Sequence, residues 1–302
     1  NIHDEYAEKD ANNVVIIEDK QLARIYTKEF EQMWGTKFDT PDPLGSRFHK
    51  SKVKISEHLS INSIPIEVYM APSDSIRETI IRAIESSDHE IYISVFAATD
   101  EEITKALIEK IEEGIDVKGV FEKMSGSWKY SMYNKLVEYS DYIVEDDTPR
   151  LLHHKYMLID ANHYQSNPIC ITGSVNWSSG GIEANDENML LIRDASIANQ
   201  YAQEFWARYN EAGGKKELRF LSACPFNNGK GIDSVAVVIQ SDGEKEIVFR
   251  FYDIWGKPIF NSKFTTQEGG NRLIVKDNAP LSYGLYFLML ENKSDTLKYK
   301  ID

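Results

Sequence analysis

The chain has 302 residues, of which 42% are hydrophobic, which predicts a globular protein with two domains or one large domain and a module. No stretch approaches the roughly 18 unbroken apolar residues that a transmembrane helix needs, and two cysteines are too few for a disulfide framework. The net charge of -14 argues against a broad basic surface for the backbone of nucleic acid.

The first 35 residues are predicted to hold a strand and a helix. Val14–Ile17 are four consecutive β-branched apolar residues, which predicts a buried strand. Apolar side chains at helical spacing predict a helix over Gln21–Trp34, and Gly35 supplies the usual C-terminal signal. Residues 36–60 are polar and contain two prolines, so we expect a linker there.

Residues 61–212 are predicted to form one complete α/β unit. Its expected strands and helices alternate along the chain: strand 66–70, helix 76–86, strand 91–96, helix 101–113 and strand 117–121. This alternation implies parallel pairing of the strands through right-handed crossovers.

His153 and Lys155 are the most informative side chains of this unit. They lie two residues apart in a predicted strand, so both should point to the same face of the sheet while His154 points away. An imidazole can attack phosphorus or protonate a leaving oxygen, and an ammonium attracts a phosphoryl oxygen. The pair therefore indicates a phosphodiester site, although His-x-Lys alone also occurs by chance on edge strands.

Four more residues support this interpretation. Asp160 completes an H-x-K-x4-D pattern, and Gly173, Ser174 and Asn176 form a G-S-x-N element on the next predicted strand. Ser174 and Asn176 would bring neutral hydrogen-bond donors beside the ammonium. The remaining histidines lie in polar surroundings without a second ligand at metal spacing, so we expect neither a metal nor another cofactor.

Residues 1–35 repeat residues 176–210 without a gap. Aligned pairs that argue for the repeat are Asn13 with Asn188, Tyr26 with Tyr201, and Glu29 with Glu204. The alignment places Asn1 on Asn176, so we expect Asn1 to be the last residue of an earlier, equivalent G-S-x-N element. Chance similarity between two amphipathic segments is the alternative.

Beyond Pro225 the sequence changes character. Short alternating runs predict strands over 235–239, 247–252, 272–275 and 285–290, at the spacing of a β-sandwich. We expect residues 213–229 to form a hinge and residues 230–302 to fold as a small all-β module.

The H-x-K-x4-D and G-S-x-N motifs together resemble the HKD signature of the phospholipase D superfamily, over about residues 1–212. The resemblance implies a mixed sheet flanked by helices, in which two halves each contribute one His–Lys pair to a shared site. Residues 1–35 would then be the tail of a truncated first half. Its missing His–Lys pair would have to come from the same polypeptide or from a second subunit. The implied reaction is a metal-free double displacement through a phosphohistidine.

The same resemblance assigns roles around the histidines. Glu187 follows Asn176 at the interval where the family places an acid that bonds to the histidine of the opposite half. The repeat puts Asn12, an amide, at the equivalent place facing His153. A carboxylate supports a positive imidazole and an amide does not. We therefore expect the missing histidine to be the nucleophile and His153 the general acid, while an exposed loop position is the alternative for Glu187.

The C-terminal pattern F-Y-D-I-W-G-K-P-I-F, G-G-N-R-L and L-S-Y-G-L-Y-F-L-M-L resembles the sorting domain of the type IX secretion system. It implies a secreted or cell-surface protein whose module is recognised by secretion machinery. A carbohydrate- or surface-binding module is the alternative.

These observations predict a phosphodiesterase. Phospholipid is the favoured substrate, because an acidic chain without a basic groove suits nucleic acid poorly and the module indicates work outside the cell. An endonuclease is the alternative enzyme. A catalytically silent surface or binding protein is the alternative from another class.

Overall fold

The computed structural model describes residues 10–50, 52–163, 166–215, 219–227, 232–241, 243–253, 256–267, 269–275, 286–291 and 296–301. It divides into two compact units, residues 1–214 and 215–302. Asn1 and the next eight residues lie outside the described part of the chain.

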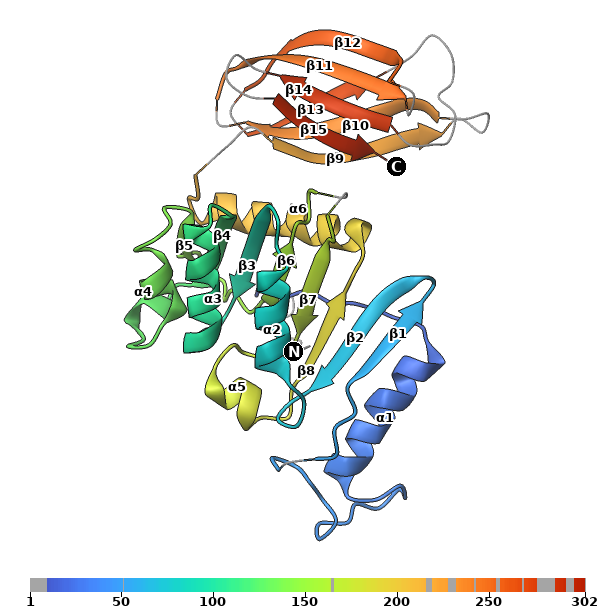
Figure 1. Ribbon diagram of the computed structural model, residues 1–302, viewed down its shortest axis with the longest axis vertical. Helices are drawn as coiled ribbons and strands as arrows, with labels where there is room; N and C mark the ends of the chain where they lie inside the picture. The colour runs from blue at the N-terminus through green and yellow to red at the C-terminus, as the bar shows by residue number, and fades with distance from the viewer. Residues whose placement is uncertain are drawn as a thin grey trace. The chain divides into compact units, whose positions relative to one another are not determined.

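The first unit is built on an eight-stranded mixed sheet with the order β1-β2-β8-β7-β6-β3-β4-β5 (Figure 1). Only β3–β4 and β4–β5 pair in parallel, and every other neighbouring pair is antiparallel. The strands are β1 Glu57–Ile61, β2 Ile64–Met70, β3 Glu90–Val95, β4 Asp116–Glu122, β5 Ile143–Asp146, β6 Lys155–Ile159, β7 Ile169–Gly173 and β8 Asn188–Ile192.

The parallel pairing expected from the sequence is therefore only partly correct. β3 and β4 are parallel neighbours as expected, but β2 is separated from β3 by β8, β7 and β6. The strands that carry the two motifs insert at the centre of the sheet, where they are shielded on both sides. Alternation of elements along the chain cannot reveal such an insertion.

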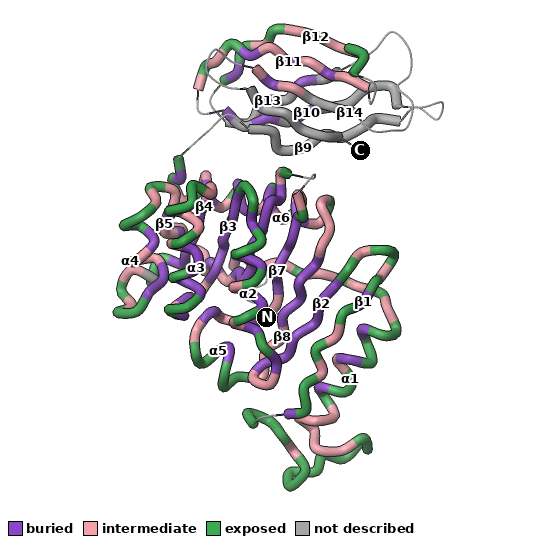
Figure 2. Tube along the Cα trace, viewed as in Figure 1, coloured by how far each residue is buried: buried purple, intermediate pink, exposed green. Residues whose placement is uncertain are grey.

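Helices cover both faces of this sheet (Figure 1). They are α1 Lys20–Trp34, α2 Ile76–Glu85, α3 Glu101–Glu112, α4 Met132–Leu136, α5 Ser179–Glu183 and α6 Ala195–Glu211, with a 3-10 turn at Ser125–Ser127. Side chains alternate between the faces along β3: Ile91, Ile93 and Val95 join the core that includes α2 and α3. The ring of Tyr92, on the other face, stacks 4.9 Å from that of Phe205 in α6. β3 is accordingly buried along its whole length (Figure 2).

Aspartates begin three of the long helices. The side chains of Asp19, Asp100 and Asp194 accept hydrogen bonds from the first free backbone N–H groups of α1, α3 and α6. α1 ends at Gly35, which has a left-handed backbone (φ 86°). A Cβ atom there would lie 2.2 Å from the Asp42 carbonyl oxygen, so only glycine fits this close approach.

Two expectations for the N-terminal region are wrong. Val14–Ile17 does not form a buried strand, because Val14 is 69% and Ile16 91% exposed. In the described part of this segment only Ala11 pairs with a neighbour, in a parallel bridge to Leu152, so no sheet edge buries the apolar run. The expected linker 36–60 is also shorter, since residues 57–60 belong to β1 and pair with β2.

The second unit is all-β, as expected. Its strands are β9 Arg219–Asn227, β10 Ile232–Ser241, β11 Glu246–Asp253, β12 Pro258–Thr265, β13 Gly269–Val275, β14 Tyr286–Glu291 and β15 Thr296–Ile301. They form the sheets β13-β10-β9 and β12-β11-β14-β15, and every pair is antiparallel. β9 occupies much of the expected hinge 213–229, because its residues pair with β10 instead of remaining free.

Candidate active site

A cavity of about 250 Å³ lies beside the start of β6. Lys155 is the first residue of β6 and His153 lies two residues before it, and both line the cavity, as expected for residues two apart. The other lining residues come from the N-terminal segment, α1, β7 and the residue after it, and β8: Asn12, Asn13, Val15, Tyr26, Thr172, Gly173, Ser174, Asn188 and Leu190. The cavity therefore joins the N-terminal segment to both sequence motifs.

The N-terminal segment holds His153 at the cavity. The backbone N–H of His153 donates to the Ala11 carbonyl oxygen at 3.0 Å. Its ring Nδ1 lies 3.3 Å from Oδ1 of Asn12, the residue that the repeat alignment places there. The Phe96 ring packs edge-on against the imidazole, with 5.0 Å between centroids. The backbone bond thus holds the residue, while the Asn12 amide and the Phe96 ring orient its imidazole.

The surroundings of His153 disfavour its charged form. Burial, and after it the positive charge of Lys155, lower the pKa of His153 to about 4. The imidazole is therefore neutral in the free protein at neutral pH. A general acid must carry a proton, so the role expected from the sequence requires an anionic substrate that raises this pKa.

Lys155 is almost fully buried, with 7% of its surface exposed. Its Nζ donates to the His153 carbonyl oxygen at 2.8 Å and lies 5.2 Å from the centroid of the Phe96 ring. Burial lowers the pKa of Lys155 to about 8, against the attraction of Glu187. An ammonium in so dry a position gains much from an arriving phosphoryl oxygen.

We expect kcat/KM for phosphodiester hydrolysis to fall as pH rises through about 8. Burial lowers the pKa of Lys155, so the ammonium is present below this pH and lost above it. Lys155→Arg keeps its charge to much higher pH and should move the alkaline limb of the profile upward. Profiles of kcat/KM against pH for both proteins test this, and an alkaline limb at the same pH in both would contradict it.

Asp160 supports the site without lining the cavity. Its fully buried carboxylate accepts from the backbone N–H groups of Asp88, His89 and Glu90 at 2.9–3.0 Å. Burial acts to raise the pKa of Asp160, but hydrogen bonds from Ser166 and from this backbone outweigh it and lower the pKa. Asp160 thus anchors the turn before β3 to the end of β6, which is a structural role.

Gly173 and Ser174 bring β7 and β8 together beside the cavity. A Cβ atom on Gly173 would lie 2.1 Å from the Asn188 carbonyl oxygen, so a side chain there is excluded. The backbone N–H of Ser174 donates to that same oxygen at 2.9 Å, and Ser174 Oγ accepts from the Asn188 backbone N–H at 3.0 Å. The hydroxyl of Ser174 can rotate to donate its own hydrogen bond to a ligand in the cavity.

Two of the expected catalytic residues stand apart from this cavity. Asn176 and Glu187 are half-buried and are not among its lining residues. Within the described residues, Oδ1 of Asn176 is buried without a hydrogen-bond partner. Glu187 Oε1 accepts a 3.4 Å hydrogen bond from Asn185, while its backbone oxygen accepts from Ala71. Among the described residues, no hydrogen bond or ion pair joins either side chain to His153.

His154 faces away from the cavity, as expected, and is buried with 1% of its surface exposed. One ring nitrogen lies 2.9 Å from Asn13 Oδ1 and the other 3.1 Å from Glu204 Oε1. The other carboxylate oxygen of Glu204 accepts from the Tyr156 hydroxyl at 2.6 Å. His154 therefore ties the motif strand to the helix α6 on the opposite face.

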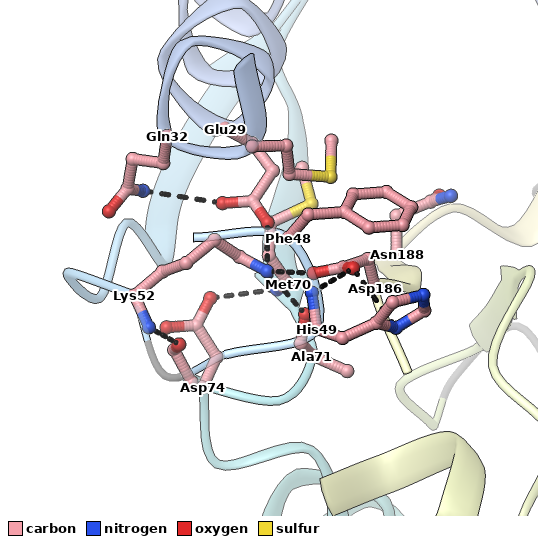
Figure 3. Close-up of polar contacts among 12 residues, drawn as sticks. Glu29, Gln32, Phe48, His49, Lys52, Met70, Ala71, Asp74, Asp186 and Asn188 are labelled. Carbon is pink, nitrogen blue, oxygen red and sulfur yellow. Dashed lines mark hydrogen bonds and ion pairs between the residues drawn. The ribbon is translucent and has the colours of Figure 1, made fainter. Parts of the chain in front are cut away.

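A buried ion cluster holds the loop that carries Glu187 (Figure 3). Lys52 has a fully buried side chain, and its Nζ pairs with Glu29 of α1 at 3.0 Å and with Asp186. Burial raises the pKa of Glu29, against the lowering influence of Lys52. Asp186 directly precedes Glu187, so this cluster fastens α1 and the end of the linker to the loop before β8.

Sequence reasoning missed several residues of the site. Asn13, Tyr26 and Asn188 line the cavity but were used only as markers of the repeat. Their alignment in pairs was the signal that could have identified them. Phe96 and Lys52 carry no such local signal, because they reach the site only through the folded sheet.

Among the described residues, no group of three or more His, Cys, Asp or Glu side chains is arranged so that it could hold a metal ion. No described helix is long and apolar enough to cross a membrane.

Comparison with known proteins adds the following. Residues 80–209 match the family model described as "Cardiolipin synthase, PLD-like domain". A phospholipase D of Rickettsia bellii is 25% identical over 169 residues, which cover 56% of this chain and 77% of that protein. The mitochondrial cardiolipin hydrolase of Homo sapiens is 24% identical over 140 residues, which cover 45% and 53% respectively.

Among solved structures, Nuc from Salmonella typhimurium, a phospholipase D family member, is 24% identical with a TM-score of 0.44. The match covers 48% of this chain and 94% of Nuc. NucT from Helicobacter pylori is 18% identical with a TM-score of 0.45, covering 50% and 99%. The family match over residues 80–209, together with the similar sequences, supports a phospholipase D-like domain in this part of the chain, as the two motifs indicated. The match ends at residue 209, before the second unit.

Proposed function

We propose that this chain, through its phospholipase D-like domain, hydrolyses phosphodiesters by way of a phosphohistidine. The observation that carries the proposal is the shared cavity of His153 and Lys155, with Ser174 and Asn12 beside them. A buried ammonium and a neutral hydroxyl suit the phosphoryl oxygens, and an imidazole suits attack or proton transfer.

The proposed reaction is a double displacement that uses two histidines. One histidine attacks phosphorus while the bond to the leaving oxygen breaks, and the other gives that oxygen its proton. The second histidine then takes a proton from water, whose oxygen attacks phosphorus and breaks the P–N bond. We assign proton transfer to His153 and attack to a histidine from a complementary half, either in the same polypeptide or in a second subunit.

The phosphodiester itself would prepare His153 for this role. Burial, and after it repulsion from Lys155, lower the pKa of His153, and the negative charge of a phosphodiester placed between Lys155 and His153 opposes that repulsion. Asn12 accepts at the far ring nitrogen and orients the imidazole without adding a charge. Glu187 would serve the histidine of the complementary half in the same way, but with a carboxylate. Asn176, whose amide oxygen has no hydrogen-bond partner among the described residues, would act at the same shared site.

Phospholipid is the substrate class that we favour, with the endonuclease and the silent binding protein as alternatives. The charge of -14 disfavours long contact with a nucleic acid backbone, and one buried lysine at the cavity is enough for a single phosphoryl group.

Head-group release decides between these substrates. Full-length protein should release head group from phospholipid vesicles, also in the presence of EDTA, and leave single- and double-stranded DNA and RNA intact. Cleavage of nucleic acid without lipid turnover would show that the protein is an endonuclease and not a phospholipase. Turnover of neither substrate would favour the binding protein.

We also propose that the second unit, residues 215–302, is a sorting module for secretion, which makes the protein extracellular or surface-bound. Its independent β fold supports this, since a recognition tag need not share the catalytic core. Deleting residues 215–302, the whole second unit, should leave turnover nearly unchanged and retain the protein in the producing cell. Normal export of the truncated protein would refute the sorting role.

A further inference from the structure

Two segments that correspond in the repeat meet at the cavity. They are residues 12–26, here the first segment, and residues 187–201, the second segment. Each has an asparagine immediately after the residue assigned to a catalytic histidine: Asn13 follows Asn12, and Asn188 follows Glu187. Each also has a tyrosine at the same later position, Tyr26 in the first and Tyr201 in the second.

The two asparagines and two tyrosines are hydrogen-bonded across the segments. Asn13 Nδ2 donates to the Tyr201 hydroxyl oxygen at 2.9 Å. The Tyr26 hydroxyl donates to Asn188 Oδ1 at 3.1 Å. The asparagine of each segment thus bonds to the tyrosine of the other, and both asparagines line the cavity. Both bonds therefore join one segment to the other, and neither lies within a single segment.

Both tyrosines are suited to a permanent structural hydrogen bond. Burial raises the pKa of Tyr26 and of Tyr201 to about 12. Both hydroxyls therefore keep their protons throughout the physiological range. The bonds do not switch with pH.

The remaining contacts of the asparagines lead to the motif strands. Asn13 Nδ2 also donates to Thr172 Oγ1 at 2.9 Å, on β7. Asn188 Nδ2 donates to Ser174 Oγ at 3.2 Å. Each cross-segment bond therefore holds an asparagine beside the site. Its Nδ2 reaches a residue that lines the cavity, and the residue before it is the one assigned to a catalytic histidine.

We propose that Tyr26 and Tyr201 are positioning residues, which lock the two segments together and hold the histidine-facing residues in place. Tyr201 acts through Asn13 on the Asn12–His153 contact, and Tyr26 acts through Asn188 on the loop of Glu187. The catalytic consequence rests on the proposed function, whereas the two cross-segment bonds stand on the geometry.

Amide hydrogen exchange in the full-length protein tests the first bond directly. Tyr201→Phe removes only the hydroxyl and keeps the ring. The amides of Ala11 and His153 donate to Leu151 and Ala11, just before the first segment. Their exchange should quicken by about fivefold, the effect of losing one ordinary hydrogen bond. Exchange at the amides of Ser174 and Asn188 should stay unchanged.

The second bond gives the opposite pattern. Tyr26→Phe should quicken exchange at Ser174 and Asn188 and leave Ala11 and His153 unchanged. Tyr139→Phe, at a 46% exposed position, makes the same chemical change and should alter none of these amides. Equal changes at both sets of amides, or no change in either variant, would overturn the proposal.

Turnover then separates positioning from packing. Tyr201 is not among the residues that line the cavity, so Tyr201→Phe should lower kcat by about tenfold with little change in KM. The expected exchange pattern with an unchanged kcat would overturn the positioning role. A wild-type protein without any phosphodiester turnover would instead refute the proposed function, and the exchange pattern would still show whether the two bonds exist.

Discussion

Replacing His153 or Lys155 by alanine in the full-length protein should lower phosphodiester turnover by about a hundredfold or more. His153→Ala removes the group that transfers the proton. Lys155→Ala removes the one ammonium that lines the described cavity. Either loss raises the barrier by several kcal/mol, because each 1.4 kcal/mol is a factor of about ten in rate. The steady-state rate of leaving-group release from a chromogenic phosphodiester measures the effect, because each turnover after the first also needs hydrolysis of the phosphohistidine, for which His153 activates water.

The control for this experiment is a histidine far more exposed than His153. The side chain of His58 is 72% exposed and lies on β1, so His58→Ala should keep the wild-type rate. Circular dichroism establishes that all three variants are folded. Wild-type turnover in the His153 or the Lys155 variant would remove that residue from the active site.

The largest loss of stability is expected at Lys52. Lys52→Met keeps the length of the side chain but removes the buried ammonium that pairs with the buried carboxylates of both Glu29 and Asp186. Removing one partner of a buried ion pair costs about 3–5 kcal/mol. Urea unfolding followed by the helical circular dichroism signal reports on the first unit, since the described helices all lie within it.

Lys28→Met is the matched control for Lys52→Met. Lys28 also pairs with a glutamate, Glu57 at 3.6 Å, but 57% of its side chain is exposed. An exposed pair of this kind contributes less than about 1 kcal/mol, because water and salt screen it. Similar losses in both variants would mean that burial of Lys52 is not what makes its cluster important.

The features predicted correctly from the sequence depend on short-range rules. His153 and Lys155 share a cavity because side chains two apart in extended chain point the same way. α1 ends at Gly35 because a left-handed residue without a Cβ is needed there. Asn12 lies beside His153, and an alignment within the chain itself was enough to place it.

The features that escaped prediction depend on what packs against what. Val14–Ile17 has the composition of a buried strand, but burial needs a neighbouring strand that the local sequence does not specify. The cluster of Lys52 joins three parts of the chain, and no spacing rule connects them. Insertion of the motif strands between β2 and β3 is likewise a property of the whole sheet.

Detection of the phosphohistidine intermediate tests the proposed mechanism most directly. Full-length protein is mixed with a nitrophenyl phosphodiester, quenched in alkali and analysed by mass spectrometry of its peptides. We expect the phosphoryl group, with its remaining ester, on a histidine of the complementary half. The adduct should also form in His153→Ala, because nitrophenol leaves without a proton, and it should persist there because water is not activated. Turnover without a phosphorylated histidine in either protein would contradict the double displacement.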